Sequence, residues 1–257
     1  ITEGAKKPKK ITNHVKNVKM GQYVNAILKD DDSLWIWDNV GIGPKSNGNM
    51  VKIDDNVKQV ALNDHDVVYI KDNGEMWALG LDYWDAIGIK ENAGRFEQAQ
   101  KVEENVEYIS VNVKEVYAIL NNGELYRRRG TIYEDEFDDE GSWINGAEKI
   151  LDHVKFMSTP AVYYTVLKTD GSVWTWGDNF SGRLGNGTLK NSNMPEQVID
   201  NAKQVSTSMT HAAVLKNDGT LWVWGDNKYG ELGDGTTKCS VVPKEIKVGD
   251  SGLFSIR

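Results

Sequence analysis

The chain of 257 residues carries 30 lysine and arginine residues against 38 aspartate and glutamate residues, which gives a net charge of −8. An acidic chain does not favour nucleic acid or an anionic membrane as its partner, because both attract positive charge. No apolar run approaches the roughly 20 residues that cross a bilayer, so no membrane insertion is expected. The single cysteine, Cys239, cannot form an internal disulfide and leaves the compartment open.

The chain is expected to open with a linker at residues 1–7. Residues 8–11 (Pro-Lys-Lys-Ile) then match residues 195–198 and 243–246, which lie in the last strands of later repeats. The basic cluster at residues 6–10 is typical of a strand edge kept charged against aggregation. A binding patch is the alternative.

Five tandem repeats follow the linker. One aliphatic residue marks the last strand of each, and the intervals between these residues are 42, 49, 48, 48 and 48 along Ile11, Ile53, Val102, Ile150, Val198 and Ile246. The repeats therefore cover about residues 15–56, 57–105, 106–153, 154–201 and 202–249. Units of this length cannot bury their apolar faces alone and stack on their neighbours. The sequence thus predicts one domain, residues 8–257.

Each repeat is predicted to contain four short strands, of which the second and third form a hairpin. The turn is Lys216-Asn217-Asp218-Gly219 in the last repeat, and Gly74, Gly123 and Gly171 hold the glycine position in three others. Asp-Gly or Asn-Gly between β-rich runs indicates a hairpin, because glycine accepts a positive φ. Asp32 stands there in the first repeat, and aspartate tolerates that conformation. Short strands at regular spacing predict an all-β closed architecture.

Tryptophans occur in pairs two residues apart in the third strand of three repeats. The pairs are Trp35 with Trp37, Trp174 with Trp176, and Trp222 with Trp224. Residues two apart share one face of a strand, so we expect these side chains to pack between neighbouring sheets. Truncation of Trp174 or Trp222 to alanine is then expected to cost about 3–5 kcal/mol. A sugar-binding surface is the alternative use of so many tryptophans.

The last repeat carries a distinctive pattern of residues. It consists of His211 to Leu215, Asp218-Gly219, Trp222 to Asn227 (Trp-Val-Trp-Gly-Asp-Asn) and Gly230-Glu231-Leu232-Gly233. The pattern resembles the regulator-of-chromosome-condensation (RCC-type) repeat. Repeat four resembles it almost as well, whereas repeats one to three keep the skeleton and lose much of the pattern. The resemblance implies a β-propeller with about one four-stranded blade per repeat, either a five-bladed ring or part of a larger propeller.

No group of residues indicates catalysis. The four histidines, His14, His65, His153 and His211, are scattered, and no pair has metal-ligand spacing with a third ligand nearby. His14 and His153 occupy the strand junction where other repeats have asparagine, which indicates a local hydrogen-bonding role. The glycine-rich segment 225–233 precedes no helix that could hold a phosphate. We therefore expect no enzyme, no metal and no cofactor.

Aromatic residues recur in the loop after the third strand. They are Tyr83, Trp84, Tyr133, Phe137, Trp143, Phe180 and Tyr229. These loops should project from one rim of a propeller, and tyrosine and tryptophan are enriched at interface hot spots. The rim is therefore a candidate protein-binding face, unless each aromatic covers its own loop. The acidic segment 133–140 is a partner-binding or a solvated loop, and Arg128, which replaces a packing tryptophan, is a candidate to pair with it.

The sequence thus predicts a non-catalytic, protein-binding β-propeller whose partner it does not identify. Lysine- and asparagine-rich composition favours a bacterial protein that is exported or displayed on the surface, while a cytoplasmic location stays open. One alternative is a module that binds a cell-surface glycan through Tyr83, Trp84 and Tyr229. Another is an inhibitor of a secreted enzyme such as a β-lactamase, a role that the family resemblance implies. A structural spacer is the third.

Overall fold

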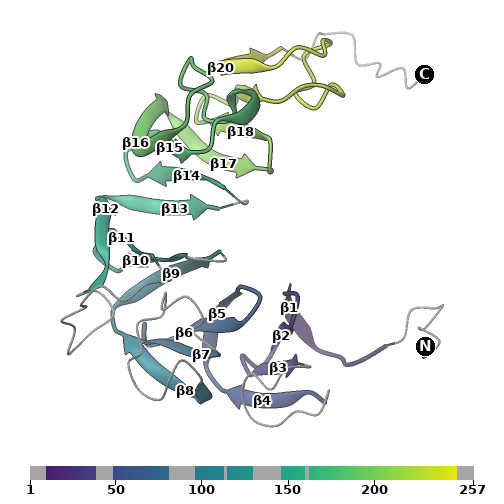
Figure 1. Ribbon diagram of the computed structural model, residues 1–257, viewed down its shortest axis with the longest axis vertical. Coiled ribbons are helices and arrows are strands. Elements are labelled where there is room, and N and C mark those ends of the chain that lie inside the picture. The colour runs from purple at the N-terminus through teal and green to yellow at the C-terminus, as the bar shows by residue number, and fades with distance from the viewer. Residues whose placement is uncertain are drawn as a thin grey trace. The chain divides into compact units, whose positions relative to one another are not determined.

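The computed structural model describes residues 10–38, 49–80, 96–112, 115–129, 146–159 and 162–247. In this part of the chain the regular structure consists of five four-stranded sheets and one short 3-10 turn, η2 (Phe180–Gly182), as Figure 1 shows. The predicted all-β architecture of five four-stranded repeats is therefore confirmed. No helix among the described residues is long and apolar enough to cross a membrane.

The strands of the five sheets follow one another along the chain. The first sheet contains β1 (Val15–Met20), β2 (Val24–Lys29), β3 (Leu34–Asp38) and β4 (Val51–Asp54). The second contains β5 (Val57–Leu62), β6 (Asp66–Lys71), β7 (Met76–Gly80) and β8 (Phe96–Glu103), and the third β9 (Val106–Val111), β10 (Glu115–Leu120), β11 (Leu125–Arg129) and β12 (Glu148–Leu151). The fourth contains β13 (Val154–Ser158), β14 (Tyr163–Lys168), β15 (Val173–Gly177) and β16 (Ser192–Ile199), and the fifth β17 (Ala202–Thr207), β18 (His211–Lys216), β19 (Leu221–Gly225) and β20 (Ser240–Ile246). Within every sheet each strand pairs with the next one in the chain.

The chain divides into two compact units. The first is Ile1–Ala118 with Arg128–Ala147, and the second is Ile119–Arg127 with Glu148–Arg257. Each unit contains a cluster of buried apolar side chains of its own. The division into a linker at residues 1–7 and a single domain at residues 8–257 stays a prediction.

In the first unit, the sheets β1–β4 and β5–β8 pack face to face. We call the face of a sheet that meets the next sheet in chain order its downstream face, and the opposite face its upstream face. The downstream face of β1–β4 carries Val24, Ala26, Leu28, Leu34 and Ile36, and the upstream face of β5–β8 carries Val57, Val60, Val67, Tyr69 and Leu79. These side chains are buried because alternate residues of a strand point to one face. Strand β9 packs on β5 and β6 in the same way.

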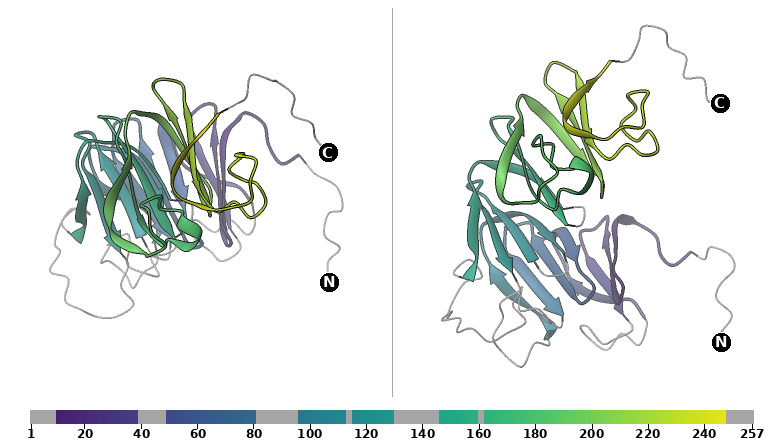
Figure 2. Two further views of the ribbon diagram at one scale, coloured as in Figure 1. Left: turned by 90° about the horizontal axis from the view of Figure 1, so that it is seen from above. Right: turned by 45° about the horizontal axis from the view of Figure 1, so that its top comes forward.

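The second unit repeats this packing between the sheets β13–β16 and β17–β20. Leu167, Val173 and Ile199 meet Ala202, Val205, Ala212, Val214 and Trp224 in one buried cluster. The phenol of Tyr163 donates a hydrogen bond of 2.7 Å to the backbone oxygen of Ser208. Figure 2 shows the twist of the strands within these sheets, which run from teal through green to yellow. Stacking of one repeat on the next is thus observed inside each unit.

A residue with positive φ immediately precedes the first strand of each sheet. His14, Asn56, Asn105, His153 and Asn201 have φ values of 56–62°. Asparagine and histidine are among the residues that tolerate this left-handed conformation. The backbone oxygens of His14 and His153 accept hydrogen bonds from Asp30 and Thr169, so the two histidines have the local role that the sequence indicated. Asp32, with φ 59°, likewise replaces the turn glycines as predicted.

In two of the three tryptophan pairs the members differ in burial, whereas Trp35 and Trp37 are both partly exposed. Trp176 and Trp224 are buried, whereas Trp174 and Trp222 are partly exposed. The ammonium of Lys216 lies 4.5 Å from the ring centroid of Trp222. The large cost that the sequence assigned to truncation of Trp174 or Trp222 therefore belongs to Trp176 and Trp224, because these two side chains are at most 2% exposed.

Candidate functional site

Two of the seven predicted rim aromatics lie in the described part of the chain. Phe180 is 65% exposed and Tyr229 is 80% exposed, so neither ring is buried under its own loop. The other five, Tyr83, Trp84, Tyr133, Phe137 and Trp143, lie outside the described residues, as does the acidic segment 133–140. Arg128 is buried where other sheets have a tryptophan or leucine, and the segment with which it was predicted to pair lies outside the described residues.

A buried asparagine organises the loop that carries Phe180. The side-chain nitrogen of Asn179 donates to Asn186 Oδ1 (3.1 Å) and to the backbone oxygens of Thr188 and Lys190 (3.0 Å each). Its side-chain oxygen accepts a hydrogen bond of 2.9 Å from the backbone nitrogen of Leu184. Because the Asn179 side chain is enclosed, these bonds fix the loop in one conformation.

The loop that carries Tyr229 has the same construction. The side-chain nitrogen of Asn227 donates to Asp234 Oδ1 (3.1 Å) and to the backbone oxygens of Thr236 (3.0 Å) and Lys238 (3.1 Å). Its side-chain oxygen accepts from the backbone nitrogen of Leu232 at 2.9 Å. The Gly-Asp-Asn pattern marked these loops in the sequence, but the asparagine was not recognised there as their centre.

Arg183 connects the Phe180 loop to the next sheet. Its Nε donates to the backbone oxygen of Phe180 at 3.1 Å and its Nη1 to that of Met209 at 2.8 Å. Its Nη2 lies 3.0 Å from Asp178 Oδ1. The guanidinium also lies 5.7 Å from the ring centroids of both Phe180 and Tyr163. Sequence reasoning missed this residue, because its partners lie in two different repeats.

Two further apolar side chains are exposed at the same edge of these sheets. Val162, just before β14, is 53% exposed, and Met209, just before β18, is 64% exposed. The backbone oxygen of Val162 accepts a hydrogen bond of 3.0 Å from Asp178, at the start of the Phe180 loop. We call Val162, Phe180, Met209 and Tyr229 the rim patch. Figure 2 shows the loop after β19, drawn in yellow, extending from the sheet β17–β20.

Charged groups lie beside Tyr229 of the rim patch. The ammonium of Lys228 lies 5.2 Å from the ring centroid of Tyr229. Glu231 Oε2 accepts a hydrogen bond of 2.8 Å from the backbone nitrogen of Tyr229, and such backbone donors lower the pKa of Glu231. In the part of the chain that is described, no group of three or more histidine, cysteine, aspartate or glutamate residues could hold a metal ion. What the rim patch provides is an exposed, largely apolar surface for contact.

The repeated four-stranded sheets, stacked face to face, define a protein built from propeller-type blades. A family model described as Regulator of chromosome condensation (RCC1) repeat matches residues 170–215 and 218–254, and a second model of the same description matches residues 202–231. The C-terminal repeats of this chain are therefore RCC1 repeats, and the predicted resemblance is confirmed. No curated protein matches the sequence.

Solved structures of RCC1-type propellers have the same fold. Human WBSCR16 is 20% identical with a TM-score of 0.66, over 91% of this chain and 67% of that chain. Prp20p from Saccharomyces cerevisiae, described with its binding to Gsp1p and histones, is 14% identical with a TM-score of 0.66, over 92% of this chain and 64% of that one. Yeast RCC1 (Prp20) bound to Kap60 is 15% identical with a TM-score of 0.64, over 92% and 62%. The chain thus spans about two thirds of the length of these structures.

Proposed function

We propose that this chain is a non-catalytic, protein-binding module of the β-propeller type, and that the rim patch contacts the partner. One observation supports this above the others: four apolar side chains, each more than half exposed, stand on loops at one edge of two neighbouring sheets. Exposed apolar side chains that gather in one place mark interaction sites. Aromatic residues within such a site tend to dominate its binding energy.

The loops under the rim patch are held in place before any partner arrives. Asn179, Asn227 and Arg183 use their hydrogen bonds to fix the backbone that carries Phe180 and Tyr229. A surface that is already ordered loses little conformational entropy on binding. This rigidity favours recognition of a partner through a preformed surface.

The neighbours of the two rings favour a protein over a glycan. A cation lies near each ring, Arg183 at 5.7 Å from the centroid of Phe180 and Lys228 at 5.2 Å from that of Tyr229. Aliphatic Val162 and Met209 add surface that has no stacking plane. The related protein Prp20 has protein partners, namely Gsp1p, histones and Kap60. The proposal also includes that the protein is bacterial and is exported or displayed on the cell surface; the amino-acid composition supports this part.

The test is affinity capture with the whole chain as bait, comparing the wild type with a Phe180→Ser/Tyr229→Ser variant. Met194→Ser/Val242→Ser is the matched control, because Met194 and Val242 are also exposed but lie on the outer strands β16 and β20. We expect one protein to be recovered by the wild type and the control and lost with the rim variant. Recovery that is indifferent to the rim variant refutes the proposal. Glycan-array binding that requires Tyr229, with no protein recovered, would favour the carbohydrate module.

A further inference from the structure

We propose that Arg183 and Glu231 are positioning residues of the rim patch, and that each sets the orientation of one peptide group in the turn that carries an aromatic ring. As a result, one loop presents a backbone N–H at its surface and the other presents a backbone oxygen. The use of these two groups by a partner rests on the proposed function. The orientation of the two peptides is a property of the free chain.

The two loops of the rim patch can be compared residue by residue. Residues 179–185 (Asn-Phe-Ser-Gly-Arg-Leu-Gly) align with residues 227–233 (Asn-Lys-Tyr-Gly-Glu-Leu-Gly). Each segment begins with a four-residue turn, closed by a hydrogen bond of 3.1 Å from its fourth residue, a glycine, to its first, the central asparagine. Arg183 and Glu231 hold the same position directly after the turn. The loops therefore carry opposite charges at one equivalent place.

The two turns differ in backbone conformation. Ser181, the third residue of the first turn, has φ 60° and ψ 18°, while Phe180 before it has no positive φ. This is the form of a type II turn, which requires a positive φ at its third residue. Tyr229, at the same place in the second turn, has no positive φ, as in a type I turn. The dihedral angles on either side of the middle peptide differ by about 150–170° between these types, so this peptide is turned over.

The charged residue after each turn accounts for the difference. Arg183 Nε donates a hydrogen bond of 3.1 Å to the backbone oxygen of Phe180. Glu231 Oε2 accepts one of 2.8 Å from the backbone nitrogen of Tyr229. The middle peptide of the first turn thus points its carbonyl at a cation, and that of the second points its N–H at an anion. Hydrogen bonds to charged groups are the stronger kind, so they can hold serine in a left-handed conformation that it rarely adopts.

The other end of each peptide faces the opposite way. In a trans peptide the N–H and the C=O point in opposite directions, so the N–H of Ser181 points away from Arg183 and the oxygen of Lys228 away from Glu231. Neither group has a hydrogen bond to another described residue. Ser181 is partly exposed and Lys228 is exposed. The rim patch therefore offers a backbone donor in one loop and a backbone acceptor in the other.

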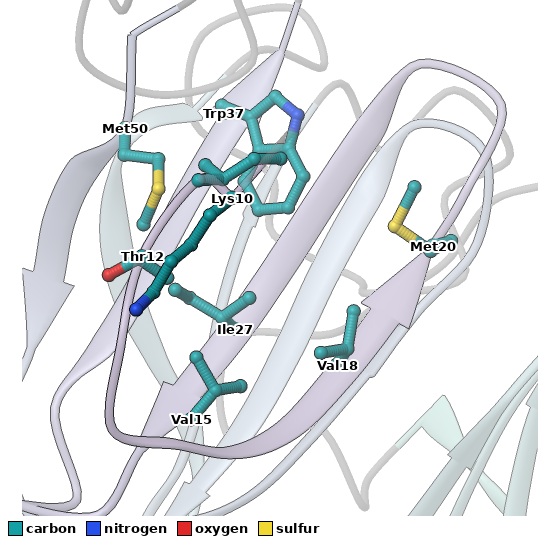
Figure 3. A pocket seen from close by; sticks show the side chains of 9 residues that line it. Lys10, Thr12, Val15, Val18, Met20, Ile27, Trp37 and Met50 are labelled. Carbon is teal, nitrogen blue, oxygen red and sulfur yellow. The ribbon is translucent and has the colours of Figure 1, made fainter. Parts of the chain in front are cut away.

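The strands of a sheet offer a different kind of surface. Figure 3 shows a hollow of about 350 Å³ on the sheet β1–β4, lined mainly by apolar side chains, among them Val18, Met20 and Trp37. Backbone groups within a sheet bond to the neighbouring strands, so such a face provides chiefly apolar contact. The two rim turns combine exposed rings with oriented polar groups of the main chain.

A polypeptide main chain is the partner chemistry that fits both groups. Every residue except proline carries one acceptor and one donor on its main chain, so one segment can accept from the N–H of Ser181 and donate to the oxygen of Lys228. Its apolar side chains would then cover Phe180 and Tyr229. Recognition of peptides commonly joins main-chain hydrogen bonds with contacts for side chains in this way.

Substitution of Ser181 by glycine tests the turn on the free chain. Ser181→Gly should raise the denaturation midpoint, because glycine adopts a positive φ without steric cost. Ser181→Ala, which removes only the hydroxyl, should not raise it. Ser206→Gly is the matched control in the exposed part of β17, where φ is not positive, and it should lower the midpoint. A Ser181→Gly variant that behaves like Ser206→Gly overturns the proposal.

Substitution of Arg183 tests what sets the turn. The gain from Ser181→Gly should persist with Arg183→Lys and disappear with Arg183→Met. The nuclear Overhauser effect between Phe180 Hα and the Ser181 N–H reports the turn type directly, since ψ of the second residue brings these protons together in a type II turn only. It should be strong in the wild type and in Arg183→Lys and weak in Arg183→Met.

Glu231→Arg provides the reciprocal test, and it serves if Arg183→Met does not fold, because Glu231 is exposed. It should strengthen the corresponding effect between Lys228 Hα and the Tyr229 N–H. Amide hydrogen exchange in the wild type should be faster at Ser181 than at Tyr229. Turns that keep their types in Arg183→Met and in Glu231→Arg overturn the proposal, and so does the opposite order of exchange.

These measurements use the free chain, so they stand or fall separately from the capture experiment that tests the proposed function. A protein captured by the wild type should bind Arg183→Lys equally well. It should bind Arg183→Met about fivefold more weakly, the loss expected for one hydrogen bond. Equal binding of Arg183→Met, with its turn changed to type I, would overturn the use of the Ser181 N–H by the partner.

Discussion

The indole nitrogen of Trp224 donates a hydrogen bond of 2.9 Å to the backbone oxygen of Arg183. This bond joins the core of the fifth sheet to the long loop of the fourth. The same loop presents Phe180, and Arg183 extends from it to Met209. The packing of the fourth sheet on the fifth and the position of Phe180 in the rim patch therefore depend on the same loop.

Replacement of Trp224 by alanine should destabilise the protein far more than replacement of Trp222. Trp224 is enclosed, so Trp224→Ala is expected to cost about 3–5 kcal/mol, as large aromatic deletions do. Trp222 is partly exposed and contributes mainly its contact with Lys216 and its hydrogen bond to Thr220, together roughly 1–2 kcal/mol. Urea denaturation of both variants measures the difference. Equal costs would show that the second tryptophan of the pair is not the main packing residue.

Gly185→Ala should damage the contact between the fourth and fifth sheets. A Cβ at Gly185 would lie 2.7 Å from the ring of Trp224, at a φ of +72°. Gly233→Ala is the matched control, because its φ is +67° and nothing lies within 4 Å. Both variants carry backbone strain of about 1–2 kcal/mol, and only Gly185→Ala adds an overpacking cost of about 1–3 kcal/mol. Melting temperatures compare the two; a larger loss for Gly233→Ala would contradict the packing described.

Asn227→Ala should loosen the loop that carries Tyr229. The substitution removes the donor for Thr236 and Lys238 and the acceptor for Leu232, and buried groups left without partners cost about 1–3 kcal/mol. Asn217→Ala is the control, since Asn217 bonds Asn201 at an exposed site. We expect Asn227→Ala to lower the denaturation midpoint and to speed amide hydrogen exchange in residues 226–239. Unchanged exchange there would mean that the loop is held by other contacts.

Glu75 should make stability depend on pH in the acid range. Lys101 donates a hydrogen bond of 3.0 Å to Glu75 Oε1, and this bond, with those from Asn73 and Trp77, lowers the pKa of Glu75 from 4.5 to about 2. A carboxylate with a lowered folded pKa adds stability above its unfolded pKa and loses it as the pH falls. The window here is about 4.5 down to about 2.

The variant Glu75→Gln tests this dependence. Its melting temperature should lie below that of the wild type at neutral pH, and the gap should close as the pH falls through the window. High salt should narrow the gap at neutral pH as well, because the pair is at the surface and is screened. A gap that is the same at all pH values would show that the side chain acts through packing and not through its charge.

Several parts of the fold could be predicted from the sequence because they depend on neighbouring residues. Turn chemistry is local, so Gly171 and Gly219 located their hairpins, and Asp32 was recognised as a substitute for glycine. The spacing of Ile53, Val102 and later aliphatic residues gave the repeat length. Strand alternation then predicted that Trp176 and Trp224 face a neighbouring sheet.

Other parts depended on contacts between repeats. In the last pair, Trp224 packs against the loop of the preceding sheet, through Arg183 and Gly185. Met209 and Val162 lie in short turns without any repeated aromatic pattern, and only the packing of adjacent sheets brings them to the edge where Phe180 stands.

The amino-acid sequence by itself determined the repeats, their strands and the residues of their turns, since these follow from φ preferences and from side-chain alternation over a few residues. Only the tertiary structure decided which apolar residues are enclosed and which stay open. Val18 and Val60 look alike in the sequence, yet one is exposed and the other is buried. The physical reason is that burial belongs to a pair of sheets, so it depends on residues of another repeat and not on the strand alone.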